Sequence, residues 1–175
     1  MKNVIYLLSG VMILLCAQAC QDKKSKNYNQ GQDEQEGVVF IKSGIEGGLT
    51  EIKASGLAIT NSNNQKVIDL AKMMIDDHTK TGEELKQLET DKKITETDTI
   101  NSAHQQMIND LSKKSGKAFD KMYLQMMVAD HEEAVKLFTN ASSNSDNKIK
   151  KVASQNLPTI KIHLDSANAI CIALK

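Results

Sequence analysis

The chain contains no arginine and no tryptophan, and it has a single proline. Its 22 basic residues are all lysines and balance 22 acids. Nucleic-acid recognition usually depends on forked guanidinium contacts and on a surplus of positive charge, and both are missing here. We therefore expect no nucleic-acid partner.

The first nineteen residues have the pattern of an export signal. Lys2 is followed by an apolar run over residues 4–15, which is shorter than the about 20 residues that span a bilayer. Residues 17–20 (AQAC) resemble a lipobox and also suit ordinary signal peptidase, which would remove the same residues. We expect lipidation of Cys20 and attachment to a membrane through this lipid, with simple secretion as the alternative.

Residues 20–37 are predicted to be a lipidated, flexible tether. After Cys20 this segment holds one aromatic residue, no aliphatic residue and many charges and amides, so it cannot bury enough apolar surface to offset the entropy of ordering. The domain then covers residues 38–175, enough for one core. Cys171 is its one cysteine, which excludes a disulfide framework, so the fold must hold by packing.

Composition and apolar spacing predict an all-α domain. Helices are expected at about residues 39–60, 65–90, 97–114, 117–141 and 147–175. The glycines of the first helix are expected to permit close approach of a neighbouring backbone. Pro158 predicts a kink or break in the last helix near residues 156–157. The first helix is expected to turn one apolar face to the core, made by Ile41, Ile45, Leu49, Ile52 and Ile59.

Two hexapeptides echo one another, residues 73–78 (MMIDDH) and 126–131 (MMVADH). The echo suggests a duplicated helical hairpin, as in a ferritin-like antiparallel four-helix bundle with an additional helix. Within the echoes, Met74 lies four residues before His78 and Met127 four before His131, so each pair shares one helical face, the apolar one. His163 of the last helix could join them in the interior, and so could His104.

These side chains form a candidate metal site. Imidazole and thioether ligands together suit Cu(I) best, and zinc or iron less well. Asp77 and Asp130 are turned about 100° from their neighbouring histidines, where each could orient an imidazole on another helix. Ring nitrogens about 3 to 4 Å apart would suit shared coordination, and separations beyond about 8 Å would exclude it. The alternative is that the histidines and methionines only support the core.

Catalytic patterns are missing from the sequence. Di-iron carboxylate chemistry in four-helix bundles uses Glu-x-x-His twice, and no Glu-x-x-His occurs here. A glycine-rich phosphate loop, a Gly-x-Ser-x-Gly elbow and a His-Glu-x-x-His motif are missing as well. The sequence therefore gives no reason to expect an enzyme.

Residues 73–80, 116–131 and 157–164 together resemble the domain-of-unknown-function 4142 family of exported bacterial proteins. The resemblance covers about residues 38–173 and implies a ferritin-like bundle in the cell envelope, periplasmic or anchored to the outer membrane. It points to His78, His131 and His163 as family-pattern positions and implies no activity. The glycine-rich first helix departs from the family's usual pattern. We expect an envelope lipoprotein that binds a metal ion, or alternatively a structural or protein-interaction module.

Overall fold

A computed structural model describes the backbone of residues 19–174 and the side chains of residues 31–174. Most of the predicted export signal, and the side chain of Cys20, lie outside this range. The described residues form five helices and no strand, which confirms the predicted all-α bundle. The helices are α1 (Ala19–Asn61), α2 (Gln65–Asp91), α3 (Ser102–Ser112), α4 (Gly116–Ala141) and α5 (Asn147–Ala173).

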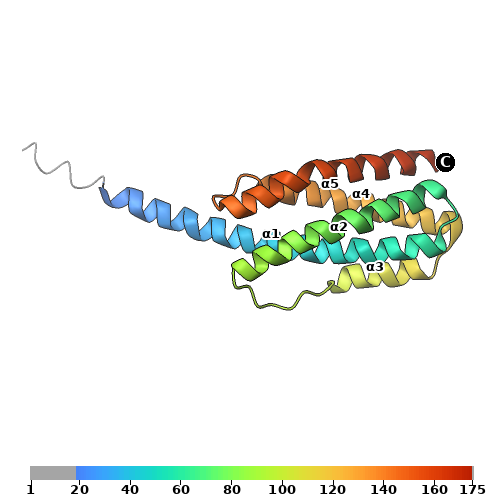
Figure 1. Cartoon of the computed structure of the whole chain (residues 1–175), viewed down its shortest axis with the longest axis horizontal. Helices are drawn as coiled ribbons and strands as arrows, with labels where there is room; N and C mark the ends of the chain where they lie inside the picture. Colours follow the sequence, from blue (N-terminus) through green and yellow to red (C-terminus); the bar gives the residue numbers. More distant parts are fainter. Residues whose placement is uncertain (1–18, 175) are drawn as a thin grey trace, which may run out of the picture.

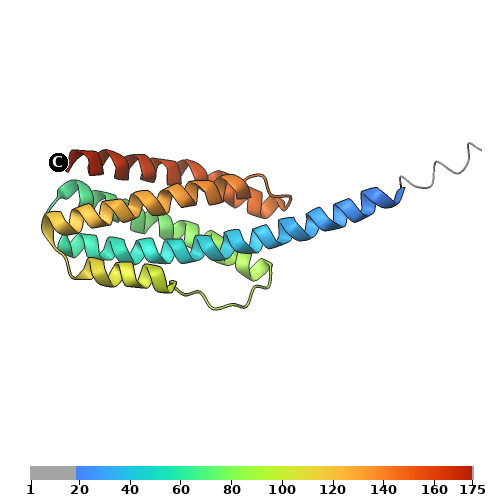
Figure 2. The ribbon, with the colours of Figure 1, turned by 180° about the vertical axis from the view of Figure 1, so that it is seen from behind.

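Four long helices make the bundle, and α3 is the additional one. Helix α1 packs against α2 and α4, and α5 packs against the same two. Figures 1 and 2 show that each of these neighbours runs antiparallel to the next. Helices α2 and α4 therefore face each other across the diagonal of the bundle. Helix α3 lies outside the bundle, on α1 and α4.

Side-chain caps fix where three helices begin. Asn64 accepts a hydrogen bond from the Lys66 amide at the start of α2, and Asn101 accepts one from the His104 amide at the start of α3. Asp146 accepts from two amides at the start of α5. Each cap satisfies donors that a helix terminus leaves without an intrahelical partner. The short connections before α2 and α5 can therefore turn the chain back sharply.

The predicted flexible tether is corrected by the structure, because α1 continues through residues 20–37. Lysine, glutamine and glutamate are good helix formers, and no proline interrupts this segment. Gln32 donates to Glu36 one turn later, at 3.2 Å. Asn144, before α5, donates to the Asp33 carbonyl oxygen at 2.9 Å, which ties the extension to the bundle.

The buried face of α1 matches the predicted face at Ile41 and Ile45, which are 0% and 2% exposed, and departs from it in the second half of the helix. Ile59 is 40% exposed and Ile52 is half-buried, whereas Thr50, Glu51 and Ser55 are buried. The Ser55 hydroxyl lies 2.9 Å from the Tyr123 hydroxyl of α4. Small side chains on this face leave room for polar partners from the other helices, which the pattern of isoleucines alone does not reveal.

The single proline does not break α5. Pro158 lies inside a helix that is continuous from Asn147 to Ala173. Asn156 donates from its side chain to the Val152 carbonyl oxygen at 2.9 Å and to Glu84 of α2 at 2.7 Å. Packing against α2 thus supports α5 where the proline removes a backbone donor.

Apolar side chains form two clusters along the bundle axis. One cluster lies toward the turn between α1 and α2 and includes Leu70, Met74, Tyr123 and Met127. The other lies toward the loop between α4 and α5 and includes Ile45, Leu85, Phe138 and Ile160. A layer of polar side chains separates them.

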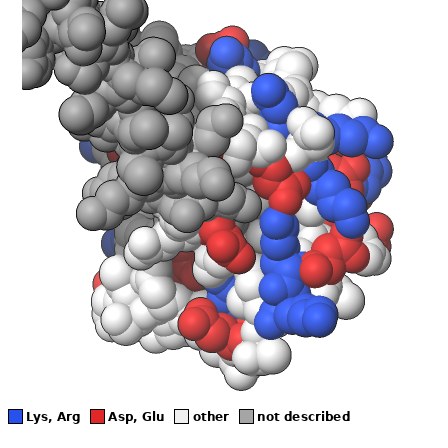
Figure 3. Space-filling model, turned by 90° about the vertical axis from the view of Figure 1, so that its left-hand side faces the viewer, with Lys and Arg blue, Asp and Glu red and all other residues white. Residues whose placement is uncertain are grey.

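Charges of both signs mix at the end of the bundle shown in Figure 3. Lys148 contacts Asp91 at 2.5 Å, and Lys92 pairs with Asp146. Such exposed pairs add little to stability, with a median of about 0–1 kcal/mol. None of the described helices is both long enough and apolar enough to span a bilayer.

Candidate metal centre

Each of the four long helices contributes one side chain to the polar layer: Glu51 from α1, His78 from α2, His131 from α4 and His163 from α5. In each of these four helices, the buried apolar residues before the layer residue belong to one cluster, and those after it belong to the other. His131, for example, follows Met127 and precedes Phe138. The four positions therefore lie at one level of the bundle.

The layer is almost completely buried. His131 is 0% exposed, His163 1%, Glu51 3% and His78 7%. Burying a carboxylate and three imidazoles between apolar clusters costs free energy unless each group gains partners. The contacts within the layer show how far this is achieved.

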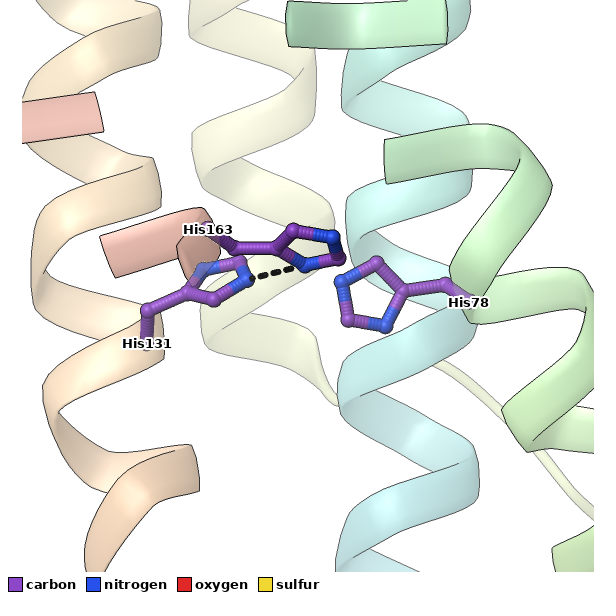
Figure 4. Close-up of side chains that lie close together, drawn as sticks. All are labelled: His78, His131 and His163. Atoms are coloured by element: carbon purple, nitrogen blue, oxygen red, sulfur yellow. Dashed lines mark hydrogen bonds between the residues drawn. The ribbon is translucent and has the colours of Figure 1, made fainter. Parts of the chain in front are cut away.

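Three imidazoles converge at the centre of the layer, as Figure 4 shows. One ring nitrogen from each of His78, His131 and His163 lies within 4.8 Å of the other two. The Nε2 atom of His131 and the Nδ1 atom of His163 are 3.3 Å apart. Ligands about 2.0–2.1 Å from a tetrahedral ion lie about 3.3–3.4 Å from one another, so this pair already has the spacing of shared coordination.

The outer nitrogens of His131 and His163 face acceptors. His131 Nδ1 lies 2.9 Å from the Met127 carbonyl oxygen and 3.2 Å from Glu51 Oε1. His163 Nε2 lies 3.1 Å from Asp77 Oδ2. A carbonyl and an ionised carboxylate can only accept, so each of these outer nitrogens carries a proton.

The facing nitrogens of the neutral rings then both present lone pairs. A neutral imidazole has one N–H and one acceptor nitrogen, and the N–H is already assigned to the outer side in both residues. In these neutral tautomers the two lone pairs, 3.3 Å apart, repel, and the hydrogen bond drawn as a dashed line in Figure 4 forms only when one of the rings gains a second proton. A cation between them, either a metal ion or a proton, converts this repulsion into attraction.

His78 forms an ion-pair contact with Glu51. Its Nε2 lies 2.9 Å from Glu51 Oε2, but off the direction of an N–H hydrogen bond, so this nitrogen has no aligned partner among the described residues. Burial lowers the pKa of His78, but the Glu51 carboxylate outweighs it and the pKa is raised. Burial raises the pKa of Glu51, and the neighbouring His78, with a contact to the His131 ring, lowers it, with a net result of about 2.

The other two imidazoles are held neutral. Burial lowers the pKa of His163 to about 4, and a charge on His78 adds to this, against the opposing effect of Asp77. Burial also lowers the pKa of His131, despite Glu51. Neutral imidazole is the form that binds metal ions, so two of the three rings are ready to coordinate at neutral pH.

Asp77 and Asp130 both contact an imidazole on another helix, but only Asp77 contacts the layer. Asp77 of α2 lies against His163 of α5. Asp130 of α4 lies 3.8 Å from His104 of α3, whose other nitrogen is 2.8 Å from Glu46. Burial raises the pKa of Asp130 to about 6. His104 therefore does not belong to the group of three histidines formed by His78, His131 and His163.

The candidate methionines are fully buried in the apolar cluster next to the layer. Met74 and Met127 are both 0% exposed. Met127 contacts the layer through its backbone, because its carbonyl oxygen accepts from His131. Their role as thioether ligands stays a prediction.

Sequence reasoning missed Glu51. The signal that could have found it is a single acid among small residues: Gly47 and Gly48 precede it, and Ala54 and Ser55 follow one turn later. An acid surrounded by small residues on a helix is a candidate interior partner for histidines on neighbouring helices.

Comparisons with known proteins place the chain in a family. A solved structure described as the crystal structure of a DUF305 fragment from Deinococcus radiodurans matches with a TM-score of 0.69 and 13% identity, covering 78% of this chain and 95% of that one. At this identity the likeness shows the fold alone. No curated protein matches. The family model described as "Domain of unknown function (DUF4142)" matches residues 22–170, which include all three histidines of the layer, and the chain therefore belongs to this family, as the resemblance predicted.

Proposed function

We propose that this protein binds one first-row transition-metal ion in the buried layer, through one ring nitrogen each of His78, His131 and His163. The observation that carries the proposal is that the facing ring nitrogens of His131 and His163 are 3.3 Å apart while both outer nitrogens lie against acceptors. In the tautomers that these acceptors favour, a hydrogen bond between the two rings needs an additional proton, whereas a metal ion between them bonds to both. The Nε2 atom of His78, which has no aligned hydrogen-bond partner among the described residues, supplies the third nitrogen ligand.

The donor set favours a borderline divalent ion. Imidazole suits Zn²⁺, Cu²⁺, iron and nickel, and affinity for a given nitrogen site rises to Cu²⁺ and falls again at Zn²⁺. Glu51 adds a buried negative charge 2.9 Å from His78, which offsets the charge of a divalent ion better than that of Cu(I). Zn²⁺ and Cu²⁺ are therefore the ions to test first.

The partners of the imidazoles support the same proposal. Metal-bound histidines usually donate their second N–H to a carboxylate or a backbone carbonyl, which fixes the tautomer and the direction of the ring. His163 has the Asp77 carboxylate in this place, and His131 has the Met127 carbonyl oxygen.

Equilibrium dialysis of tag-free protein against Zn²⁺ or Cu²⁺, followed by metal analysis, tests the proposal. We expect one ion per chain. His131→Gln and His163→Gln should lose this ion, whereas His104→Gln, which removes a histidine outside the group of three, should keep it. Far-UV circular dichroism checks that each variant stays helical.

A structural role for the layer is the second candidate. Buried polar groups can specify one alignment of the helices, and the Glu51–His78 contact joins α1 to α2 within the layer. In that case the wild-type chain takes up no stoichiometric zinc, copper or iron, and the three glutamine variants behave alike.

We also propose that the chain is a lipoprotein of the cell envelope, anchored through Cys20. The AQAC motif after an apolar run supports this, and the long N-terminal part of α1 would hold the bundle away from the anchor. Metabolic labelling with a fatty acid in a bacterial host should mark the wild type and not Cys20→Ser. Equal labelling of both would contradict the anchor.

A further inference from the structure

A cavity of about 200 Å³ lies directly beside the histidine layer. His78 and Glu51 line its inner end, where both side chains are buried. Glu133 also lines it, and that side chain is 75% exposed. The cavity thus extends from the surface of α4 to two residues of the layer.

Glycines shape the cavity wall. Gly47 and Gly48 of α1 and Gly82 of α2 all line it. A Cβ atom added at Gly47 or Gly82 would meet no heavy atom within 4 Å, and one at Gly48 would meet only the His78 carbonyl oxygen, at 3.9 Å. Each glycine costs a helix about 1 kcal/mol relative to alanine. Side chains at these positions would fit the fold and would fill the cavity.

The lining carries negative charge. Of the described residues around the cavity, three are carboxylates, Glu51, Asp130 and Glu133, and none is a lysine, although Glu133 pairs with Lys136 at 2.7 Å and Glu51 with His78 at 2.9 Å. A cleft lined by one sign of charge concentrates counter-ions and raises their rate of association. At about 30 Å³ per water molecule, about 200 Å³ also holds roughly six waters, the size of a hydrated divalent ion.

The inner end of the cavity is the ion-pair contact between His78 Nε2 and Glu51 Oε2, which are 2.9 Å apart. His78 is 7% exposed, lines the cavity, and its Nε2 has no aligned hydrogen-bond partner. His104 lines the same cavity beside Asp130, so His78 is the first imidazole of the layer, but not of the cavity, that an ion meets.

We propose that this cavity is the uptake route of the metal ion, with Glu133 and Asp130 as its outer contacts and His78 as the first imidazole of the layer that the ion reaches. The inference rests on the proposed function, because it concerns how an ion arrives at the same layer. The ion exchanges its waters stepwise for carboxylate oxygens and then for ring nitrogens. The route requires that the glycine-lined wall stay unfilled.

The rate of Zn²⁺ uptake from a chromophoric chelator, measured by stopped flow on tag-free protein, tests the route. Gly47→Leu and Gly82→Leu should slow both association and release, each by about tenfold or more, and leave the equilibrium affinity unchanged. Gly56→Leu is the matched control, because Gly56 lies on the same helix as Gly47, is exposed, and also has no heavy atom within 4 Å of an added Cβ.

A second pair of variants tests the charge at the mouth. Glu133→Gln should lower the association rate at low ionic strength and weaken its dependence on salt, whereas Glu132→Gln should not, because Glu132 is exposed and does not line the cavity. Leucine variants that take up Zn²⁺ as fast as Gly56→Leu would overturn the route and direct attention to the side of the layer at Asp77. A wild type that takes up no ion would instead overturn the proposed function itself.

Discussion

His131 and His163 meet in the core with their facing nitrogens 3.3 Å apart, and each donates from its other nitrogen to an acceptor of its own. The pair comes from the neighbouring helices α4 and α5 and is joined by His78 from α2, with ring centroids 5.2–5.4 Å apart. The stability of the bundle should therefore depend on what cation the layer contains.

Zn²⁺ should stabilise the folded chain. A ligand that binds only the folded state at about 100 times its Kd adds about 2.7 kcal/mol to the free energy of unfolding, which raises the Tm of a chain of this size by roughly 5–10 °C. Thermal unfolding followed by circular dichroism measures this shift. His163→Gln should lose it and His104→Gln should keep it. An equal shift in all three proteins would mean that the ion binds elsewhere.

Removing the charge of Asp77 should weaken metal binding without abolishing it. Asp77 fixes the ring of His163 through a contact of 3.1 Å, and loss of such a partner typically costs about 10- to 100-fold in metal affinity. Competition titration of Asp77→Asn against a zinc chelator measures the loss. Asp76→Asn is the control, because Asp76 is exposed and adjacent in sequence. Equal affinities of the two variants would contradict a positioning role for Asp77.

Helical periodicity predicted inward positions for His78 and His131 but left His104 as a further candidate, and the family resemblance singled out His163. His78, His131 and His163 lie at inward positions of long, strongly periodic helices, so their direction follows from the spacing of the apolar residues around them. Four-residue spacing also predicted that Met74 and Met127 would be buried on the same faces. What periodicity does not supply is the rotation of a helix whose apolar stripe is weak.

Helix α1 is that case, and it explains why Glu51 was missed. Its isoleucines correctly predicted that Ile41 and Ile45 are buried, but from Thr50 onward the helix buries small and polar residues in place of Ile52 and Ile59. Acids are almost never fully buried unless paired, and the partners of Glu51 lie 27 and 80 residues away in the chain. Long-range pairing of this kind is not visible in local sequence.

The glycines of α1 were predicted to allow close approach of a neighbouring backbone, and the structure divides them. Gly48 approaches the His78 carbonyl oxygen, at 3.9 Å from its would-be Cβ, while Gly44 approaches the side chain of Leu85. Gly47 lines the cavity, and Gly56 lies in open space at the surface. Local sequence does not distinguish these situations, because glycine is equally compatible with close packing against a neighbouring helix and with the wall of a cavity.

Metal binding should release protons. Glu51 raises the pKa of His78, so at pH 6.5 this ring is more than half protonated, and it must lose its proton to become a ligand. Calorimetric titration with Zn²⁺ in buffers of different ionisation enthalpy should give more than about half a proton released per ion at pH 6.5 and fewer at pH 9. Glu51→Gln should reduce the release at pH 6.5. A proton count that does not change with pH would contradict the assignment of His78.

Acid should destabilise the metal-free protein through His163. Its pKa is about 4 in the folded chain and about 6.5 in an unfolded one, so between these values the unfolded chain binds more protons and folding stability falls as the pH is lowered. Over the change from pH 7 to pH 4, in the presence of a chelator, the wild type should lose about 3 kcal/mol more than His163→Gln. Urea unfolding at each pH measures the difference. Asp130 and Glu51 are present in both proteins. The effects of their shifted pKa values on stability oppose each other and largely cancel when the two proteins are compared. Parallel stability curves for the two proteins would show that His163 does not have to be neutral in the folded core, and with it the assignment of facing lone pairs would fail.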